Sequence, residues 1–159
     1  MKIGFGYDVH AFSSNRKMFI GGLEIKHDYG LLGHSDADVL LHAICDAMLG
    51  ALALGDIGKH FPNTDSKYKD ADSKSMLKEV NKLIYELGYV VGNLDSTVVI
   101  ESPKLSPHFD SMRKIISEVL NIGIDQVSIK ATTSEHLGFI GRKEGAAAYA
   151  IVLLSKKEN

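Results

Sequence analysis

The chain has 159 residues, of which 45% are hydrophobic and 24% are charged, so its length and composition suit one globular domain. A formal net charge of −2 without a basic stripe argues against a nucleic-acid-binding surface, and a single cysteine, Cys45, excludes a disulfide framework or a thiolate metal cluster. The longest apolar run, 39–54, is interrupted by His42 and Asp46 and the N-terminus lacks a signal-peptide pattern, so we expect no membrane span and a cytoplasmic location.

Residues 2–10 alternate with the period of two that is typical of a half-buried strand. Apolar side chains fall on one side, and Gly4, Gly6, Asp8 and His10 fall on the other. The glycines leave room for another group to approach the strand backbone. A carboxylate and an imidazole side by side on a strand are typical of two metal ligands, although an exposed polar strand end would give the same pattern.

A hairpin and a long helix are predicted next. The short apolar runs 18–20 and 23–25 flank Gly21-Gly22, which predicts a β-hairpin. Residues 36–54 predict a helix, and Ser35 with a carboxylate three residues later resembles a capping box. The helix is apolar nearly all round, so we expect it to be buried at the centre of the fold.

Three polar residues, Asp38, His42 and Asp46, interrupt this helix at spacings of four and therefore share one face. Buried carboxylates and imidazoles need partners, so one interpretation is a self-contained Asp-His-Asp hydrogen-bonded ladder. The other makes His42 a metal ligand, with a neighbouring carboxylate such as Asp46 orienting its ring. Seven histidines beside one cysteine favour a nitrogen and oxygen ligand set for any metal.

Hydrophobic periodicity predicts the remaining elements. They are helices over 73–87 and 106–120 and strands over 89–101, 127–133 and 145–154. The order of strand, helix and strand between 89 and 133 implies a right-handed crossover that joins parallel strands. The last strand is rich in alanine, which permits close packing against another layer or another subunit.

Two loops carry groups that suit phosphates. The loop 56–65 is dense in hydrogen-bonding groups and fixed by glycine and proline, although an ordinary connection would look similar. The segment 132–135 ends a strand with three hydroxyls and Glu135. Hydroxyls suit phosphate oxygens and a lone carboxylate suits a hard cation such as Mg²⁺, but a helix-capping cluster would use the same residue types.

Several separated blocks at this spacing resemble the family of 2-C-methyl-D-erythritol 2,4-cyclodiphosphate synthases, enzymes of the non-mevalonate isoprenoid pathway. The matching blocks are Asp8-Val9-His10, residues 34–43, 54–58 and 130–135, Phe61-Pro62, Pro103-Lys104, Pro107-His108, Gly138-Phe139 and Gly141-Arg142. Together they extend over essentially the whole chain. Two positions depart from the family pattern, because Ala37 stands where glycine is common and Asn63 where aspartate is common.

The resemblance implies a single α+β domain over residues 1–159. It would be a two-layer sandwich with a mixed sheet and helices on one face, assembled as a homotrimer with active sites between adjacent subunits. The resemblance also implies a zinc ion bound by Asp8, His10 and His42, and a second divalent cation, Mg²⁺ or Mn²⁺, bound by Glu135.

The implied substrate is 4-diphosphocytidyl-2-C-methyl-D-erythritol 2-phosphate. Its 2-phosphate attacks the β-phosphorus and CMP leaves, which makes the enzyme a phosphorus–oxygen lyase. The implied catalytic residues, as transition-state stabilisers, are His34 and Thr133. The implied substrate-binding residues are Asp8, Val9, His10, His34, Ser35, Asp56, Ile57, Gly58, Phe61, Pro62, Asn63, Thr64, Asp65, Ile100, Glu101, Ser102, Pro103, Lys104, Leu105, Ser106, Thr132, Thr133, Ser134, Glu135, Phe139 and Arg142.

Within that set the resemblance assigns 56–58 to the methylerythritol part and 100–106 to a cytidine pocket, where Lys104 also reaches the diphosphate. Phe139 and Arg142 would contact ligand near the trimer axis. Two other functions fit the same residues. A zinc-dependent phosphohydrolase of nucleotide or sugar diphosphates would share the ligands, and a trimeric metal- or nucleotide-binding regulator would bind without turnover.

Overall fold

The protein is described by a computed structural model that covers residues 1–62, 64 and 71–157. Its main layer is a five-stranded sheet in the order β4-β1-β7-β5-β6, and a separate hairpin pairs β2 with β3. The strands are β1 (Lys2–Ser13), β2 (Met18–Ile20), β3 (Leu23–Ile25), β4 (Gly30–Leu31), β5 (Tyr89–Val99), β6 (Val127–Thr132) and β7 (Gly145–Lys156). β7 is antiparallel to both β1 and β5, whereas β5 and β6 are parallel, which confirms the predicted crossover and makes the sheet mixed.

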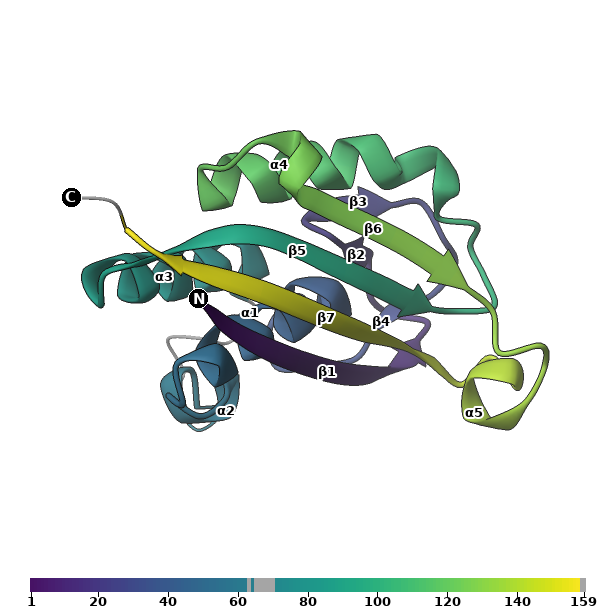
Figure 1. Cartoon of the computed structure of the whole chain (residues 1–159). Helices are drawn as coiled ribbons and strands as arrows, with labels where there is room; N and C mark the ends of the chain where they lie inside the picture. Colours follow the sequence, from purple (N-terminus) through teal and green to yellow (C-terminus); the bar gives the residue numbers. More distant parts are fainter. Residues whose placement is uncertain (63, 65–70, 158–159) are drawn as a thin grey trace.

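The helices are α1 (Val39–Ala51), α2 (Ile57–His60), α3 (Ser73–Glu86), α4 (Phe109–Leu120) and α5 (Gly138–Gly141), with 3-10 turns η2 (Ser106–His108) and η3 (Ile124–Gln126), and the three longer helices form the second layer. Figure 1 shows α1, α3 and α4 on one side of the sheet, which confirms the predicted two-layer α+β fold. Within the described ranges, no helix is long and apolar enough to cross a membrane.

The central helix α1 is shorter than its sequence pattern predicts. It begins at Val39 because Asp38 has an extended backbone and caps the helix, its side chain accepting a hydrogen bond from the Leu41 backbone N–H. The predicted capping box at Ser35 is therefore wrong. Left-handed backbone at Ala37 (φ 57°) and Ala53 (φ 58°) prevents the helix from extending in either direction.

A platform of small side chains supports α1. On β1, Gly4 and Gly6 lie opposite Val152 and Ala150 of β7, and these positions are buried. Alanines at 146 and 148 continue the platform and are 0% exposed. The close packing predicted from the alanine-rich strand is thus realised between the sheet and α1.

The other face of the sheet is open and apolar. The outward side chains of β1 and β7 include six large hydrophobic groups that are 41–70% exposed. They are Ile3, Phe5, Tyr7, Val9, Tyr149 and Ile151. Exposed apolar groups gathered on one face in this way are typical of surfaces that associate with another molecule.

Candidate active site

The site begins with the contact between β1 and α1. A Cβ added to Gly4 would stand 1.8 Å from the Ala47 carbonyl oxygen, and one added to Gly6 would stand 1.9 Å from the Ala43 carbonyl oxygen. The group that approaches the strand backbone at these glycines is therefore the backbone of α1. This approach carries the first turn of α1 over Asp8 and His10, the next two residues on the same face of β1.

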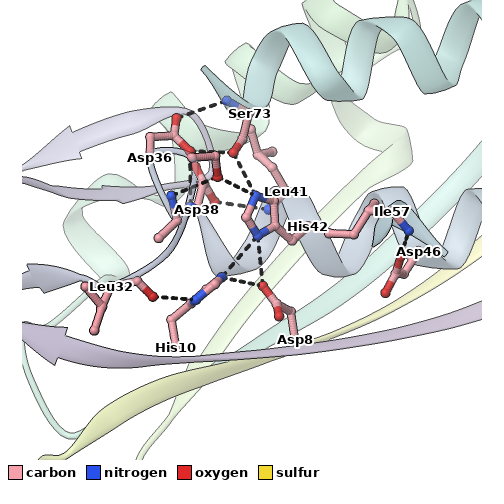
Figure 2. Close-up of polar contacts among 12 residues, drawn as sticks. Asp8, His10, Leu32, Asp36, Asp38, Leu41, His42, Asp46, Ile57 and Ser73 are labelled. Atoms are coloured by element: carbon pink, nitrogen blue, oxygen red, sulfur yellow. Dashed lines mark hydrogen bonds and ion pairs between the residues drawn. The ribbon is translucent and has the colours of Figure 1, made fainter. Parts of the chain in front are cut away.

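Three side chains converge at this point, as Figure 2 shows. Asp8 Oδ2 lies 2.9 Å from His10 Nε2 and 2.9 Å from His42 Nδ1. His10 Nε2 lies 3.1 Å from His42 Nδ1. These separations are close to the roughly 3.3 Å expected between ligand atoms around a tetrahedral zinc ion. The two nitrogens and one oxygen could hold a metal and leave a fourth position open.

The charges in this cluster favour a cation. Burial acts to raise the pKa of Asp8, but hydrogen bonds from His10 and His42 lower it to about 2. Burial acts to lower the pKa of His42, but the Asp8 carboxylate raises it above its usual value. His10 Nδ1 donates to the Leu32 carbonyl at 2.8 Å, which turns the lone pair of Nε2 toward the cluster when the ring is neutral. Three acceptors that face one another need a proton or a metal ion between them.

The ladder of Asp38, His42 and Asp46, one of the two interpretations of this stripe, does not form among the described residues. Asp38 accepts hydrogen bonds from the two backbone N–H groups of the β2–β3 turn at 2.9 and 2.6 Å, and from the first turn of α1. Asp46 accepts from the Ile57 backbone N–H at 2.8 Å, so it fixes the start of α2 and the proposed orienting role of Asp46 is wrong. Both carboxylates satisfy nearby backbone donors, an outcome that residue spacing alone does not distinguish.

A pocket of about 230 Å³ opens over the three converging side chains. Its lining brings together eight of the predicted site residues: Asp8, His10, His34, Ser35, His42, Ile57, Gly58 and Phe61. Nε2 of His34 is buried there and has no hydrogen-bond partner among the described residues. A buried ring nitrogen without a partner is a ready contact for a bound ligand.

A second pocket, of about 400 Å³, collects most of the residues predicted for the nucleotide. It is lined by Ile100, Glu101, Pro103, Lys104, Leu105, Ser106, Phe109, Ala131, Thr132 and Thr133. Phe109 was not predicted as a site residue, because the periodicity of α4 explains it as a core position. The two pockets share no lining residue, so the described chain carries them as separate cavities.

Glu101 connects the second pocket to the loop that follows β6. Its side chain is only 3% exposed and accepts hydrogen bonds from the Ser134 backbone N–H at 2.9 Å and from the Ser134 hydroxyl at 3.1 Å. The loop has left-handed backbone at Glu135 (φ 53°) and His136 (φ 64°), which is strained for residues with side chains. Glu101 thus holds the strained segment that presents Thr133 and Glu135, whose side chains are exposed.

The other predicted residues lie outside these pockets. Val9 points to the open face of the sheet, and Asp56 caps α2 through the Lys59 backbone N–H. Phe139 belongs to α5, and Arg142 Nε donates to Glu144 at 2.8 Å. Ser102, Pro62 and Thr64 are described but line neither pocket, and Asn63 and Asp65 lie outside the described residues.

Three residues that no pattern singled out support the site. Arg16 donates to the carbonyls of Gly33, at 2.9 Å, and Ser35, so it braces the loop that carries His34. Ser73 and Asp36 lie behind His42. Ser73 is 0% exposed, and Asp36 is half-buried. A serine at the start of a predicted helix usually indicates a cap, so its contact with His42 has no local signal.

The chain is similar to proteins of known family. The family model described as the YgbB family matches residues 1–155. A 2-C-methyl-D-erythritol 2,4-cyclodiphosphate synthase of Clostridioides difficile (strain 630) is 61% identical, over 97% of this chain and 96% of the relative. The synthase of Bacillus mycoides (strain KBAB4) is 58% identical, over 98% of this chain and 99% of the relative.

Solved structures agree with these relatives. The bifunctional IspDF from Campylobacter jejuni superposes with a TM-score of 0.95 and 43% identity, over 99% of this chain and 42% of that longer one. IspF of Plasmodium falciparum, described as a CDP complex, superposes with a TM-score of 0.87 and 38% identity, over 99% of this chain and 97% of that one.

Proposed function

We infer, because the chain belongs to the YgbB family of 2-C-methyl-D-erythritol 2,4-cyclodiphosphate synthases, that it forms this cyclic diphosphate in the non-mevalonate isoprenoid pathway. The observation that carries the inference is the convergence of Asp8, His10 and His42 in a pocket of a chain that is 61% identical to such a synthase. The relatives give no support to the phosphohydrolase alternative.

The proposed substrate is 4-diphosphocytidyl-2-C-methyl-D-erythritol 2-phosphate. An oxygen of its 2-phosphate forms a bond to the β-phosphorus, and the bond from that phosphorus to the bridging oxygen breaks. CMP leaves with the electron pair, as in a phosphorus–oxygen lyase. The nucleophile is already an ionised phosphate, so no general base is required and the main difficulty is to bring two anions together.

The residues of the first pocket are suited to bringing two anionic phosphates together. A divalent cation held by Asp8, His10 and His42 would neutralise charge on the diphosphate and polarise the β-phosphorus. Two imidazoles and one carboxylate favour zinc. His34, with its unpartnered ring nitrogen, would donate to a phosphate oxygen beside that cation, and Ser35 would contact the same phosphates.

The second pocket would bind the nucleotide. Residues 100–106 would enclose the cytidine, with Lys104 reaching the diphosphate, while Thr132 and Thr133 contact phosphate oxygens. Glu135 would hold the second cation, Mg²⁺ or Mn²⁺. The CDP complex of the Plasmodium falciparum relative supports a cytidine diphosphate ligand. Residues 56–58 would contact the methylerythritol part.

We propose a homotrimer with active sites between adjacent subunits. The two pockets are separate within one chain, so a substrate with a metal-bound diphosphate and a cytidine would need the first pocket of one copy and the second pocket of its neighbour. The open apolar face of β1 and β7 supplies a surface that would be buried between copies. Phe139 and Arg142 would then lie near the trimer axis. A cytoplasmic location stays a prediction.

Product identification tests the proposed function. The purified chain is incubated with the proposed substrate and Zn²⁺ plus Mg²⁺, and the phosphorus-containing products are followed by ³¹P NMR. Cyclisation gives CMP and a cyclic diphosphate. Hydrolysis gives a linear phosphate product with CMP and would favour the phosphohydrolase, whereas binding of cytidine nucleotides without turnover would favour the regulator.

A further inference from the structure

We propose that Asp36 and Ser73 form a hydrogen-bonded relay that orients His42 and sets the affinity of the metal site. Ser73 Oγ lies 2.9 Å from His42 Nε2, on the side of the ring opposite to the converging ligand atoms. The Ser73 hydroxyl also donates to Asp36 Oδ1. Figure 2 shows the three side chains in line behind the candidate site. This inference rests on the proposed metal site and adds residues to it.

The Asp36 carboxylate determines which atom donates and which accepts in each hydrogen bond of the relay. An ionised carboxylate only accepts hydrogen bonds, so the single hydroxyl proton of Ser73 goes to Asp36. The Ser73 oxygen is then left as an acceptor, and His42 Nε2 must carry a proton to donate to it. With Nε2 protonated, a neutral His42 ring has its lone pair on Nδ1, the atom that faces Asp8 and His10.

Asp36 is itself fixed, which makes the relay rigid. Its Oδ2 accepts from the Ser73 backbone N–H at 3.0 Å, so both carboxylate oxygens engage the first residue of α3. The Asp36 backbone N–H donates to the Ala71 carbonyl at 3.1 Å. Ser73 is 0% exposed, so water does not compete with the hydroxyl. The start of α3 is therefore pinned to the loop before α1, and both hold His42.

Ser35 is the other hydroxyl near this ring nitrogen. Its Oγ lies 3.2 Å from His42 Nε2, against 2.9 Å for Ser73, and it also accepts the Ala37 backbone N–H at 3.2 Å. No described carboxylate accepts the Ser35 hydroxyl proton, so Ser35 does not impose a protonation state on His42. Ser73 is the better partner because it is closer and because Asp36 determines where its proton goes.

Zinc affinity of the full chain tests the relay. The metal is removed with a chelator, and the affinity is measured by competition with a chromophoric zinc chelator for the wild type, Ser73→Ala, Asp36→Asn and the double variant. Ser117→Ala is the control, because its hydroxyl is buried and donates to the Lys114 carbonyl in α4. Loss of a group that orients a ligating histidine weakens metal binding by about 10–100-fold.

Ser73→Ala and Asp36→Asn are each expected to weaken zinc binding by about 10–100-fold, with the control within about twofold of the wild type. The double variant should bind no more weakly than Ser73→Ala, because both changes break one chain of hydrogen bonds. If the fold-loss of zinc affinity in the double variant equals the product of the two single losses, the two residues act separately, and the relay is overturned. Wild-type affinity in Ser73→Ala would also overturn it.

A further readout, NMR of the His42 ring, keeps the outcome clear. In the zinc-loaded wild type with ¹⁵N-labelled histidine, the His42 Nε2–H should give a slowly exchanging imidazole signal that Ser73→Ala loses; a signal that persists in the variant would contradict the relay. If Ser73→Ala does not fold, Asp36→Asn alone decides the result. A wild type that binds no zinc would instead overturn the proposed metal site, and the relay with it.

Discussion

The backbone of α1 rests directly on β1 where Gly6 meets Ala43, since a Cβ at Gly6 would stand 1.9 Å from the Ala43 carbonyl oxygen. His42 is the residue before Ala43, so this contact sets the height of His42 above the strand. The glycines of β1 therefore help to build the metal site. Because they have no side chains, α1 lies close enough to β1 for His42 to meet Asp8 and His10.

Gly6→Ala should destabilise the protein by about 1–3 kcal/mol, because the added methyl group forces α1 away from the sheet. It should also weaken zinc binding, since His42 moves with the helix. Urea unfolding of the metal-free protein measures the first effect. Gly50→Ala is the matched control, because its Cβ would meet only the Phe5 carbonyl oxygen at 3.9 Å and should leave stability unchanged or slightly higher. Equal stability of Gly6→Ala and wild type would contradict the contact.

Zinc affinity should fall as the pH falls, because a proton must leave His42 before a metal can bind its Nδ1. Burial acts to lower the pKa of His42, but the hydrogen bond and charge of Asp8, together with the nearby charges of Asp38 and Asp36, raise it above the usual 6.5. The loss should therefore begin above pH 6.5 and approach about tenfold per pH unit below the raised pKa. Asp8, with a pKa of about 2, stays ionised throughout. Zinc titrations between about pH 5 and 9 test this, and a flat profile would refute it.

Glu135→Ala should keep zinc bound but lose most turnover, roughly 100-fold or more, because only the second cation is affected. Metal analysis and steady-state kinetics of the same preparation measure both quantities. A variant that loses zinc together with activity would show that Glu135 supports the first metal site, against the proposed division of roles.

Glu101→Ala should lower kcat more than it weakens cytidine nucleotide binding, because the Ser134 backbone N–H loses its acceptor and the strained loop at Glu135 relaxes. Glu101→Gln retains an acceptor oxygen and should recover most of the rate. Kinetics and CDP titration of both variants provide the comparison. Equal losses in the two variants would mean that the negative charge, rather than the position of the loop, is what matters.

The sequence predicted the parts of the site that follow from short-range periodicity. The alternation in β1 correctly placed Asp8 and His10 on one face with the glycines, and the apolar run of α1 correctly predicted a buried helix. Periodicity did not show that α1 is the group lying on those glycines, because that contact joins segments about forty residues apart. The resemblance to a family, rather than spacing, supplied the complete ligand set.

The errors arose where a side chain had a competing local partner. Asp38 and Asp46 share the stripe of His42, yet each bonds to backbone N–H groups at the end of an element. The nearer hydroxyl to His42 Nε2 belongs instead to Ser73, which lies on another helix. Ala37, the position at which the resemblance led us to expect glycine, is left-handed at φ 57°, a backbone conformation that a side-chain pattern does not reveal.

We propose that Asp8, His10 and His42 hold the metal on which the reaction depends. Elemental analysis and activity assays of purified His42→Ala beside His27→Ala test this proposal most directly, because the half-buried His27 imidazole hydrogen-bonds to the Tyr29 backbone in the β3–β4 connection. We predict that His42→Ala stays folded but contains no stoichiometric zinc and forms no cyclic diphosphate, whereas His27→Ala matches the wild type in both. A folded His42→Ala protein that retains stoichiometric zinc would contradict the claim.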